Sequence, residues 1–347
     1  MKHKSIQILL AGAMTLGAIL ACNFNADSPT TEEPAAETPT LSPTLRPTAS
    51  PTATLPAIQH NDIPINLPAE RKNQAGDHDS SETAAQKRAP GGDRFTFGRF
   101  ERPFNATSMD IYFPYLDILN TAFYEDETWI YAVITLKGGD DSGRLAGKYA
   151  FEIDSDLDGR GEWLVLATKP SSSEWNVKGV QAWFDTDRAI GGSVSVGADN
   201  DGNGNGYETL LVDSGQGEDP DLAWARIAPD NPTAVELALK RSLLESDKSY
   251  MIGAWAGNDA LDPALFDFND RMTHEQAGTS LVELENFYPI KGLAELDNAC
   301  RVAIGFVPNG NEPGSCVSSK PKGQPGACSG QYVCLNFGNQ QVCVCNP

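Results

Sequence analysis

Histidine is scarce in this sequence. The 347 residues include only His3, His60, His78 and His274, and of these only His274 lies in the part expected to fold. A metal site built from several imidazoles is therefore excluded, and no Ser or Cys motif near His274 supports a catalytic triad. Met272 is too close to His274 for the two residues to straddle a haem, so an exposed histidine at a helix start is the simpler interpretation.

Basic residues are also few. Lys and Arg total 26 against 47 Asp and Glu, which gives a net charge of −21. Nucleic acid is excluded as a partner because its phosphates require basic side chains, and electrostatic binding to anionic lipid is excluded for the same reason. The acidic balance fits a soluble domain with oxygen-rich cation sites.

The N-terminal residues resemble an export signal. Met1 to Lys4 is basic, and Ile6 to Ala21 is apolar but shorter than the roughly 20 residues that span a bilayer comfortably, so residues 1–21 are expected to be a signal peptide. The segment ending Leu20-Ala21-Cys22 resembles a bacterial lipobox. The resemblance implies that Cys22 is lipidated and anchors the protein in the cell envelope, outside the cytoplasm. A plain cleaved signal with an unmodified cysteine is the alternative.

Residues 22–92 are expected to form a disordered Pro/Thr-rich linker. Asp27 to Pro56 consists almost entirely of Pro, Thr, Ser, Ala and Glu, and about 30 such residues in the polyproline II form reach roughly 90 Å. Residues 57–92 are polar and poor in aromatics, a composition that buries too little apolar surface to offset chain entropy. The linker would therefore act as a stalk.

Residues 93–295 are expected to form an all-β domain. Aromatic residues appear abruptly from Phe95 onward, and short strand-like segments with frequent turn residues predict an antiparallel β-sandwich. The segment 128–136 is apolar on both faces and is expected to be central. The expected strands cover 116–124, 128–136, 149–153, 163–167, 177–184, 192–196, 210–212, 222–227, 235–239 and 250–256.

Two acidic, glycine-rich loops connect expected strands. Carboxylates at alternate positions followed by glycine converge oxygens on one point, which suits calcium. The first loop resembles the β-hairpin calcium loop of integrin-like repeats, which implies the ligands Asp154, Asp156, Asp158, Arg160 (through its carbonyl) and Glu162. The EF-hand pattern is not met, because Val165 stands at the twelfth place.

The second loop offers Asp199, Asp201, Asn203 and Glu208 as ligands. Two registers stay open, one starting at Asp199 and the other at Asp201. Asp185 and Asp187 lie between the two loops in sequence and can lend a carboxylate to either. The alternative for both loops is an ordinary acidic hairpin turn.

Several of these segments together resemble a known family. "YAFEIDSDLDGRGEWLVLA", "GAWAGND" and "FDFNDRMTHEQAG" are similar to the DOMON-like sandwiches, which are related to carbohydrate-binding module family nine. The resemblance covers about residues 95–290. It implies a β-sandwich that binds sugars, or haem in some branches, at one sheet.

Trp175 is the candidate for an exposed sugar-binding platform. It lies in a Ser-rich loop between Glu174 and Asn176, and sugar sites combine an aromatic face with polar partners. The alternative is a tryptophan that covers a sheet end. The expected core tryptophans are Trp129, Trp183, Trp224 and Trp255.

Residues 296–347 are expected to form a disulfide-rich tail. Besides Cys22, all cysteines lie here: Cys300, Cys316, Cys328, Cys334, Cys343 and Cys345. An even set in an exported chain predicts disulfides. The spacing from Cys316 onward resembles the first five cysteines of an EGF-like module, which implies Cys316–Cys334 and Cys328–Cys343 and leaves Cys300–Cys345. A zinc knuckle is the alternative.

The sequence contains no catalytic motif. It favours a cell-surface lipoprotein that displays a calcium-stabilised β-sandwich, with a glycan as the expected ligand. Two alternatives remain: a surface polysaccharide hydrolase that uses Asp or Glu, and a structural or adhesive domain that binds another protein.

Overall fold

The computed structural model describes residues 58–82, 85, 88–89, 100–105, 110–157, 161–188, 190, 206–244, 248–266, 288–289, 294–308, 312, 331–337 and 340–346. At 88–89, 288–289 and 331–346 only the backbone is described. All described residues belong to one compact unit. In this part of the chain no helix has the length and apolar character needed to cross a membrane. The expected signal peptide, Cys22 and the Pro/Thr-rich segment Asp27 to Pro56 lie outside the described residues.

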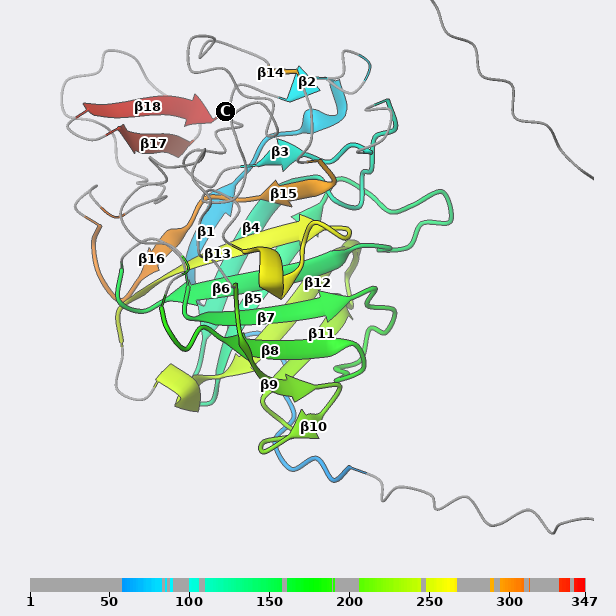
Figure 1. Ribbon diagram of the computed structural model, residues 1–347, viewed down its shortest axis with the longest axis vertical. Helices are drawn as coiled ribbons and strands as arrows, with labels where there is room; N and C mark the ends of the chain where they lie inside the picture. The colour runs from blue at the N-terminus through cyan, green and yellow to red at the C-terminus, as the bar shows by residue number, and fades with distance from the viewer. Residues whose placement is uncertain are drawn as a thin grey trace, which may run out of the picture. The chain divides into compact units, whose positions relative to one another are not determined.

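Two antiparallel sheets make up most of the described structure (Figure 1). The five-stranded sheet has the order β1-β4-β5-β12-β11. Its strands are β1 (Arg71–Gly76), β4 (Ile118–Glu125), β5 (Trp129–Leu136), β11 (Ala223–Ala228) and β12 (Asn231–Lys240). β5 is the middle strand, as its two apolar faces predict.

The nine-stranded sheet has the order β10-β9-β8-β7-β6-β13-β15-β3, and β16 also pairs with β13. Its strands are β3 (Glu101–Arg102), β6 (Lys148–Asp154), β7 (Trp163–Thr168), β8 (Val180–Phe184), β9 (Thr209–Asp213), β10 (Gln216–Gly217), β13 (Tyr250–Gly257), β15 (Leu296–Asn298) and β16 (Val302–Ile304).

Shorter elements complete the described structure. Two small antiparallel pairs are formed by β2 (Arg88–Ala89) with β14 (Tyr288–Pro289), and by β17 (Gln331–Phe337) with β18 (Gln340–Asn346). Three 3-10 turns are η1 (Ser80–Glu82), η4 (Arg241–Leu244) and η5 (Pro263–Leu265).

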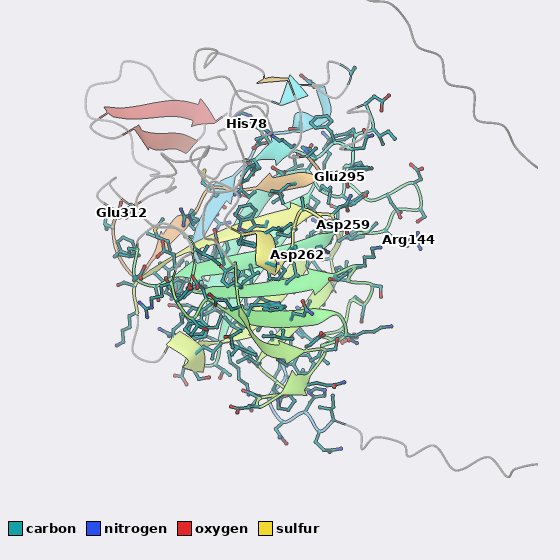
Figure 2. All side chains as sticks on the ribbon, in the orientation of Figure 1. His78, Arg144, Asp259, Asp262, Glu295 and Glu312 are labelled. Atoms are coloured by element: carbon teal, nitrogen blue, oxygen red, sulfur yellow. The ribbon has the colours of Figure 1, made fainter. Side chains whose placement is uncertain are left out.

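The main core lies between the two sheets and is built from buried side chains of both; Figure 2 shows the described side chains on the ribbon. Alternate residues of facing strands supply it, including Phe151, Ile153 and Val165 from one sheet and Val235 and Leu237 from the other. This period of two is what places one apolar face of each sheet against the other. The predicted antiparallel, sandwich-like β fold is therefore confirmed.

The opposite face of the nine-stranded sheet is also covered. A second buried cluster includes Trp255, Leu164, Tyr207 and Phe266, so loop residues outside the strands close over this face. Strand β13 is buried along its whole length as a result. Of the expected core tryptophans, Trp129, Trp224 and Trp255 are buried, and Trp183 is half-buried.

The expected domain boundaries at residues 93 and 295 are wrong. Strand β1 lies inside the predicted linker, yet it pairs with β4 along its length. At the other boundary, β15 and β16 lie inside the predicted tail and pair with β13. β1 has a polar sequence, so backbone hydrogen bonds rather than apolar side chains hold it in the sheet, and composition does not reveal such a strand.

Candidate metal centre

Four strand ends meet at one end of the nine-stranded sheet. Ile153 of β6 faces Trp163 of β7, which faces Phe184 of β8, which in turn faces Thr209 of β9. In antiparallel neighbours the end of one strand lies beside the start of the next. The acidic residues just outside these positions are therefore neighbours: Asp154, Glu162, Asp185 and Glu208.

Asp154, Asp156 and Glu162 form the loop-one cluster. One carboxylate oxygen from each lies within 4.8 Å of the others. Asp154 and Glu162 are buried, whereas Asp156 is exposed. The structure thus brings together three of the five ligands expected in the first loop. The other two, Asp158 and Arg160, lie outside the described residues.

Local hydrogen bonds fix the loop-one cluster. The backbone nitrogen and hydroxyl of Ser155 donate to Oε2 of Glu162 at 2.7 and 2.6 Å, and Leu157 N donates to Oδ1 of Asp154 at 2.5 Å. Leu157 has a φ of 66°, in the left-handed region of a tight turn. Gly161 is required, because a Cβ there would lie 2.5 Å from the carbonyl oxygen of Ile153.

Two arginines lie beside this cluster. Nη1 of Arg301 is 3.6 Å from Oδ2 of Asp154, and Nη1 of Arg188 is 3.2 Å from Oδ2 of Asp156. Burial raises the pKa of Glu162 despite the hydrogen bonds from Ser155, and the charge of Asp156 raises it further. Oxygen ligands held close together and partly dehydrated fit a hard cation such as calcium.

Asp185, Asp187 and Glu208 form the loop-two cluster, with one oxygen from each within 4.8 Å of the others. Asp185 is buried, and the other two are exposed. Oδ1 and Oδ2 of Asp185 accept hydrogen bonds from the backbone nitrogens of Arg188 and Ile190, both at 3.0 Å. Burial, followed by the charge of Glu208, raises the pKa of Asp185 to about 6, although the bond from Ile190 opposes this.

Asp185 and Asp187 thus lie together with Glu208 of the second loop, as the sequence allows. Asp199, Asp201 and Asn203 lie outside the described residues, so the register of the second loop stays open. The two clusters are directly linked: Asp185 N donates to the carbonyl of Glu162 at 2.9 Å, and Arg188 reaches Asp156. They form one acidic end of the sheet.

Trp175 is not the exposed platform that its loop predicts. Its indole is half-buried, its Nε1 donates to the carbonyl of Ile65 at 3.2 Å, and its ring packs near Tyr131 with centroids 6.0 Å apart. The reason is the N-terminal segment, predicted to be linker, which lies against this loop. Of the flanking residues, Glu174 is exposed, and Asn176 forms a backbone bridge with Ala225.

One cysteine of the predicted tail has a described side chain. Cys300 is buried in the main core and is disulfide-bonded. The side chains of Cys316, Cys328, Cys334, Cys343 and Cys345 lie outside the described residues. In backbone register, Cys334 of β17 faces Cys343 of β18. The EGF-like pairings stay predictions.

Sequence reasoning missed a third group of carboxylates, formed by Asp77, Glu101 and Asp297. They are far apart in the chain and follow no ligand spacing, so no local pattern signals them.

Comparisons with protein-family models, with curated proteins and with solved structures gave no match. The resemblance to DOMON-like sandwiches stays a prediction.

Proposed function

We propose that this protein is a lipid-anchored, extracytoplasmic binding protein whose calcium-stabilised β-sandwich binds carbohydrate. The observation that carries the proposal is the acidic end of the nine-stranded sheet, where the loop-one and loop-two clusters lie side by side. Both clusters offer only oxygen ligands, which is the donor set that calcium prefers. The anchor and the stalk follow from Cys22 and from the Pro/Thr-rich composition of the residues after it.

Calcium at this end would leave coordination positions for a ligand. The ion takes six to eight oxygens, and three carboxylates supply about three to six of them. Asp156, Asp187 and Glu208 are exposed, so the remaining positions are accessible to water or to ligand oxygens. Neighbouring hydroxyls of a sugar are suitable ligands. We therefore propose the acidic end of the sheet, rather than Trp175, as the glycan site.

The number of carboxylates gathered at each cluster favours this function over hydrolysis. In both clusters, one oxygen from each of three carboxylates lies within 4.8 Å of the others, an arrangement suited to sharing one ion. Glycosidases instead use a pair of carboxyl groups, about 5–5.5 Å apart when retaining and about 6.5–9.5 Å apart when inverting. A partner protein that offers a carboxylate is the remaining alternative occupant.

The proposal is tested on a glycan array, to which the full chain is applied once in calcium and once in chelator. The Asp156→Asn/Asp187→Asn double variant removes one carboxylate from each cluster, and Asp141→Asn is the matched control, because Asp141 is exposed and belongs to neither cluster. We expect calcium-dependent binding in the wild type and the control, and none in the double variant. Binding to no glycan would support a protein partner, and release of reducing sugar would support a hydrolase.

A further inference from the structure

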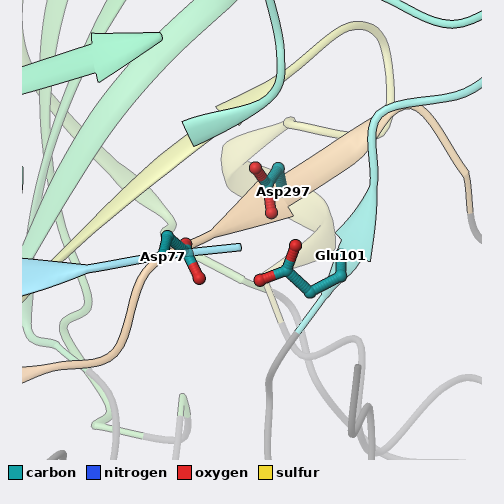
Figure 3. Close-up of side chains that lie close together, drawn as sticks. All are labelled: Asp77, Glu101 and Asp297. Atoms are coloured by element: carbon teal, nitrogen blue, oxygen red, sulfur yellow. The ribbon is translucent and has the colours of Figure 1, made fainter. Parts of the chain in front are cut away.

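Asp77, Glu101 and Asp297 form the buried carboxylate cluster, in which one oxygen from each residue lies within 4.8 Å of the others. The three carboxylate groups point toward one another (Figure 3). Asp77 follows β1 of the five-stranded sheet, whereas Glu101 belongs to β3 and Asp297 to β15 of the nine-stranded sheet. The cluster therefore joins the two sheets.

Water is excluded from most of this cluster. Glu101 and Asp297 both have 0% exposure, and so does Asp117, the residue just before β4. Burial raises the pKa of Glu101 and of Asp297, and the charges of Asp77 and Asp117 raise both further. Carboxylates gathered away from water are strongly unfavourable unless something compensates their charge.

The hydrogen bonds of these carboxylates use only some of their oxygens. Oδ2 of Asp297 accepts from Ile118 N at 2.6 Å, and Oε2 of Glu101 accepts from the hydroxyl of Ser80 at 3.4 Å. Oδ2 of Asp117 accepts from Ser80 N at 3.0 Å and from the hydroxyl of Tyr112. The second oxygens have no hydrogen-bond partner among the described residues: Glu101 Oε1, Asp117 Oδ1 and Asp297 Oδ1.

No basic side chain among the described residues neutralises these carboxylates either. No Lys or Arg in the described part of the chain forms an ion pair with Glu101, Asp117 or Asp297. A buried polar group without a partner is unusual in a folded protein and indicates an unseen ion or water. The partnerless oxygens of Glu101 and Asp297, two members of the buried carboxylate cluster, therefore point to a cation.

We propose that the buried carboxylate cluster binds a calcium ion that joins the two sheets. Calcium–oxygen distances are about 2.3–2.6 Å, so two ligands on opposite sides of one ion lie at most about 5 Å apart; the separation of up to 4.8 Å fits this limit. Magnesium fits less well, because it retains several waters and usually uses only one or two carboxylates.

This site is separate from the acidic end of the sheet. Along β13, Met251 faces Asp154, whereas Ala256 faces Asp297. Five residues of a strand span about 17 Å. The buried ion is therefore independent of the proposed glycan function, and its role is to hold β1, β3 and β15 together at the opposite end.

Calcium content measured by mass spectrometry tests the proposal. The full chain is saturated with calcium and then gel-filtered in metal-free buffer, so that weakly held surface ions are lost. We expect the Asp156→Asn/Asp187→Asn variant to retain one ion per chain, and the Glu101→Gln/Asp297→Asn variant to lose it. The proposal is overturned if the first variant retains none, or if the second folds and retains as much as the wild type.

The second variant removes two buried charges and can fail to fold, so a measurement on the wild type accompanies it. Exchange of bound calcium for radioactive calcium should show one ion that exchanges at least tenfold more slowly than the others, because the protein encloses it. A single fast exchange phase would mean that protons alone compensate the cluster, and would overturn the proposal.

Discussion

The guanidinium of Arg226 lies over the indole of Trp175, with Cζ 4.4 Å from the ring centroid. Nε of the same arginine pairs with Oε2 of Glu236 at 2.5 Å, and both side chains are buried. Nη1 of Arg226 and Nε1 of Trp175 both donate to the carbonyl of Ile65. The carbonyl of Ile65 therefore links the N-terminal segment to the indole of Trp175 and, through Arg226, to the five-stranded sheet.

Replacing Trp175 with alanine should therefore lower stability. The variant loses a half-buried indole and the cation–π contact, and we expect the free energy of unfolding to fall by roughly 1–3 kcal/mol. Urea denaturation measures this, with Lys178→Ala as a control because Lys178 is exposed in the same loop. Unchanged stability together with lost glycan binding would restore the exposed-platform interpretation.

Particular residues show what the sequence could predict. Strands such as β5 and β13 are predictable because their apolar side chains repeat locally, and the loop-one cluster is predictable because its acidic residues follow a short spacing. β1 was missed because its sequence, Arg71 to Gly76, is polar and its stability comes from pairing with β4. The buried carboxylate cluster was missed because only the fold brings Asp77 and Asp297 together.

Acid should weaken the attachment of the N-terminal segment to the sandwich. Burial tends to raise the pKa of Asp221, but hydrogen bonds from the backbone of Asp62 and Asn61 and from His60 outweigh it, so the pKa is lowered. A lowered pKa means that the ionised form stabilises the folded state above the ordinary aspartate pKa of about 3.9. This stability is lost as the pH falls through the pKa of the folded state.

Urea denaturation of the wild type and of Asp221→Asn from pH 7 to pH 2 measures this contribution. We expect the wild type to be more stable by a constant amount above about pH 5, and the difference to shrink as the pH falls below about 4. A difference that stays the same across the whole range would show that Asp221 acts through packing alone.

Removing calcium should lower the melting temperature. A ligand that binds only the folded state at 100 times its Kd adds about 2.7 kcal/mol, which corresponds to roughly 5–10 °C for a domain of about 200 residues. Scanning calorimetry with and without chelator measures the shift, and Asp156→Asn should reduce it. Asp156→Asn also breaks the ion pair with Arg188, but this pair is partly exposed and contributes little to the free energy of unfolding by itself. Identical melting curves would contradict a calcium-stabilised fold.

Lipidation of Cys22 predicts membrane attachment. Cys22→Ser removes the sulfur that carries the lipid, so we expect the variant in the soluble fraction and the wild type in the membrane fraction. Fractionation followed by a carbonate wash checks this. A Ser variant that resists the wash would show that another segment holds the protein.

The tail should contain three disulfides and no free thiol. Cys300 is disulfide-bonded and lies in the main core, so a bond from this position connects the sandwich to another cysteine. Cys300→Ser should leave one free thiol per chain and lower the free energy of unfolding by roughly 2–4 kcal/mol, as loss of a cross-link does.

Thiol titration of the denatured, unreduced protein should find no free thiol in the wild type and one in the Cys300→Ser variant. Two or more free thiols in the wild type would contradict the predicted set, and reduced stability without a new thiol would mean that packing of Cys300, not its bond, matters.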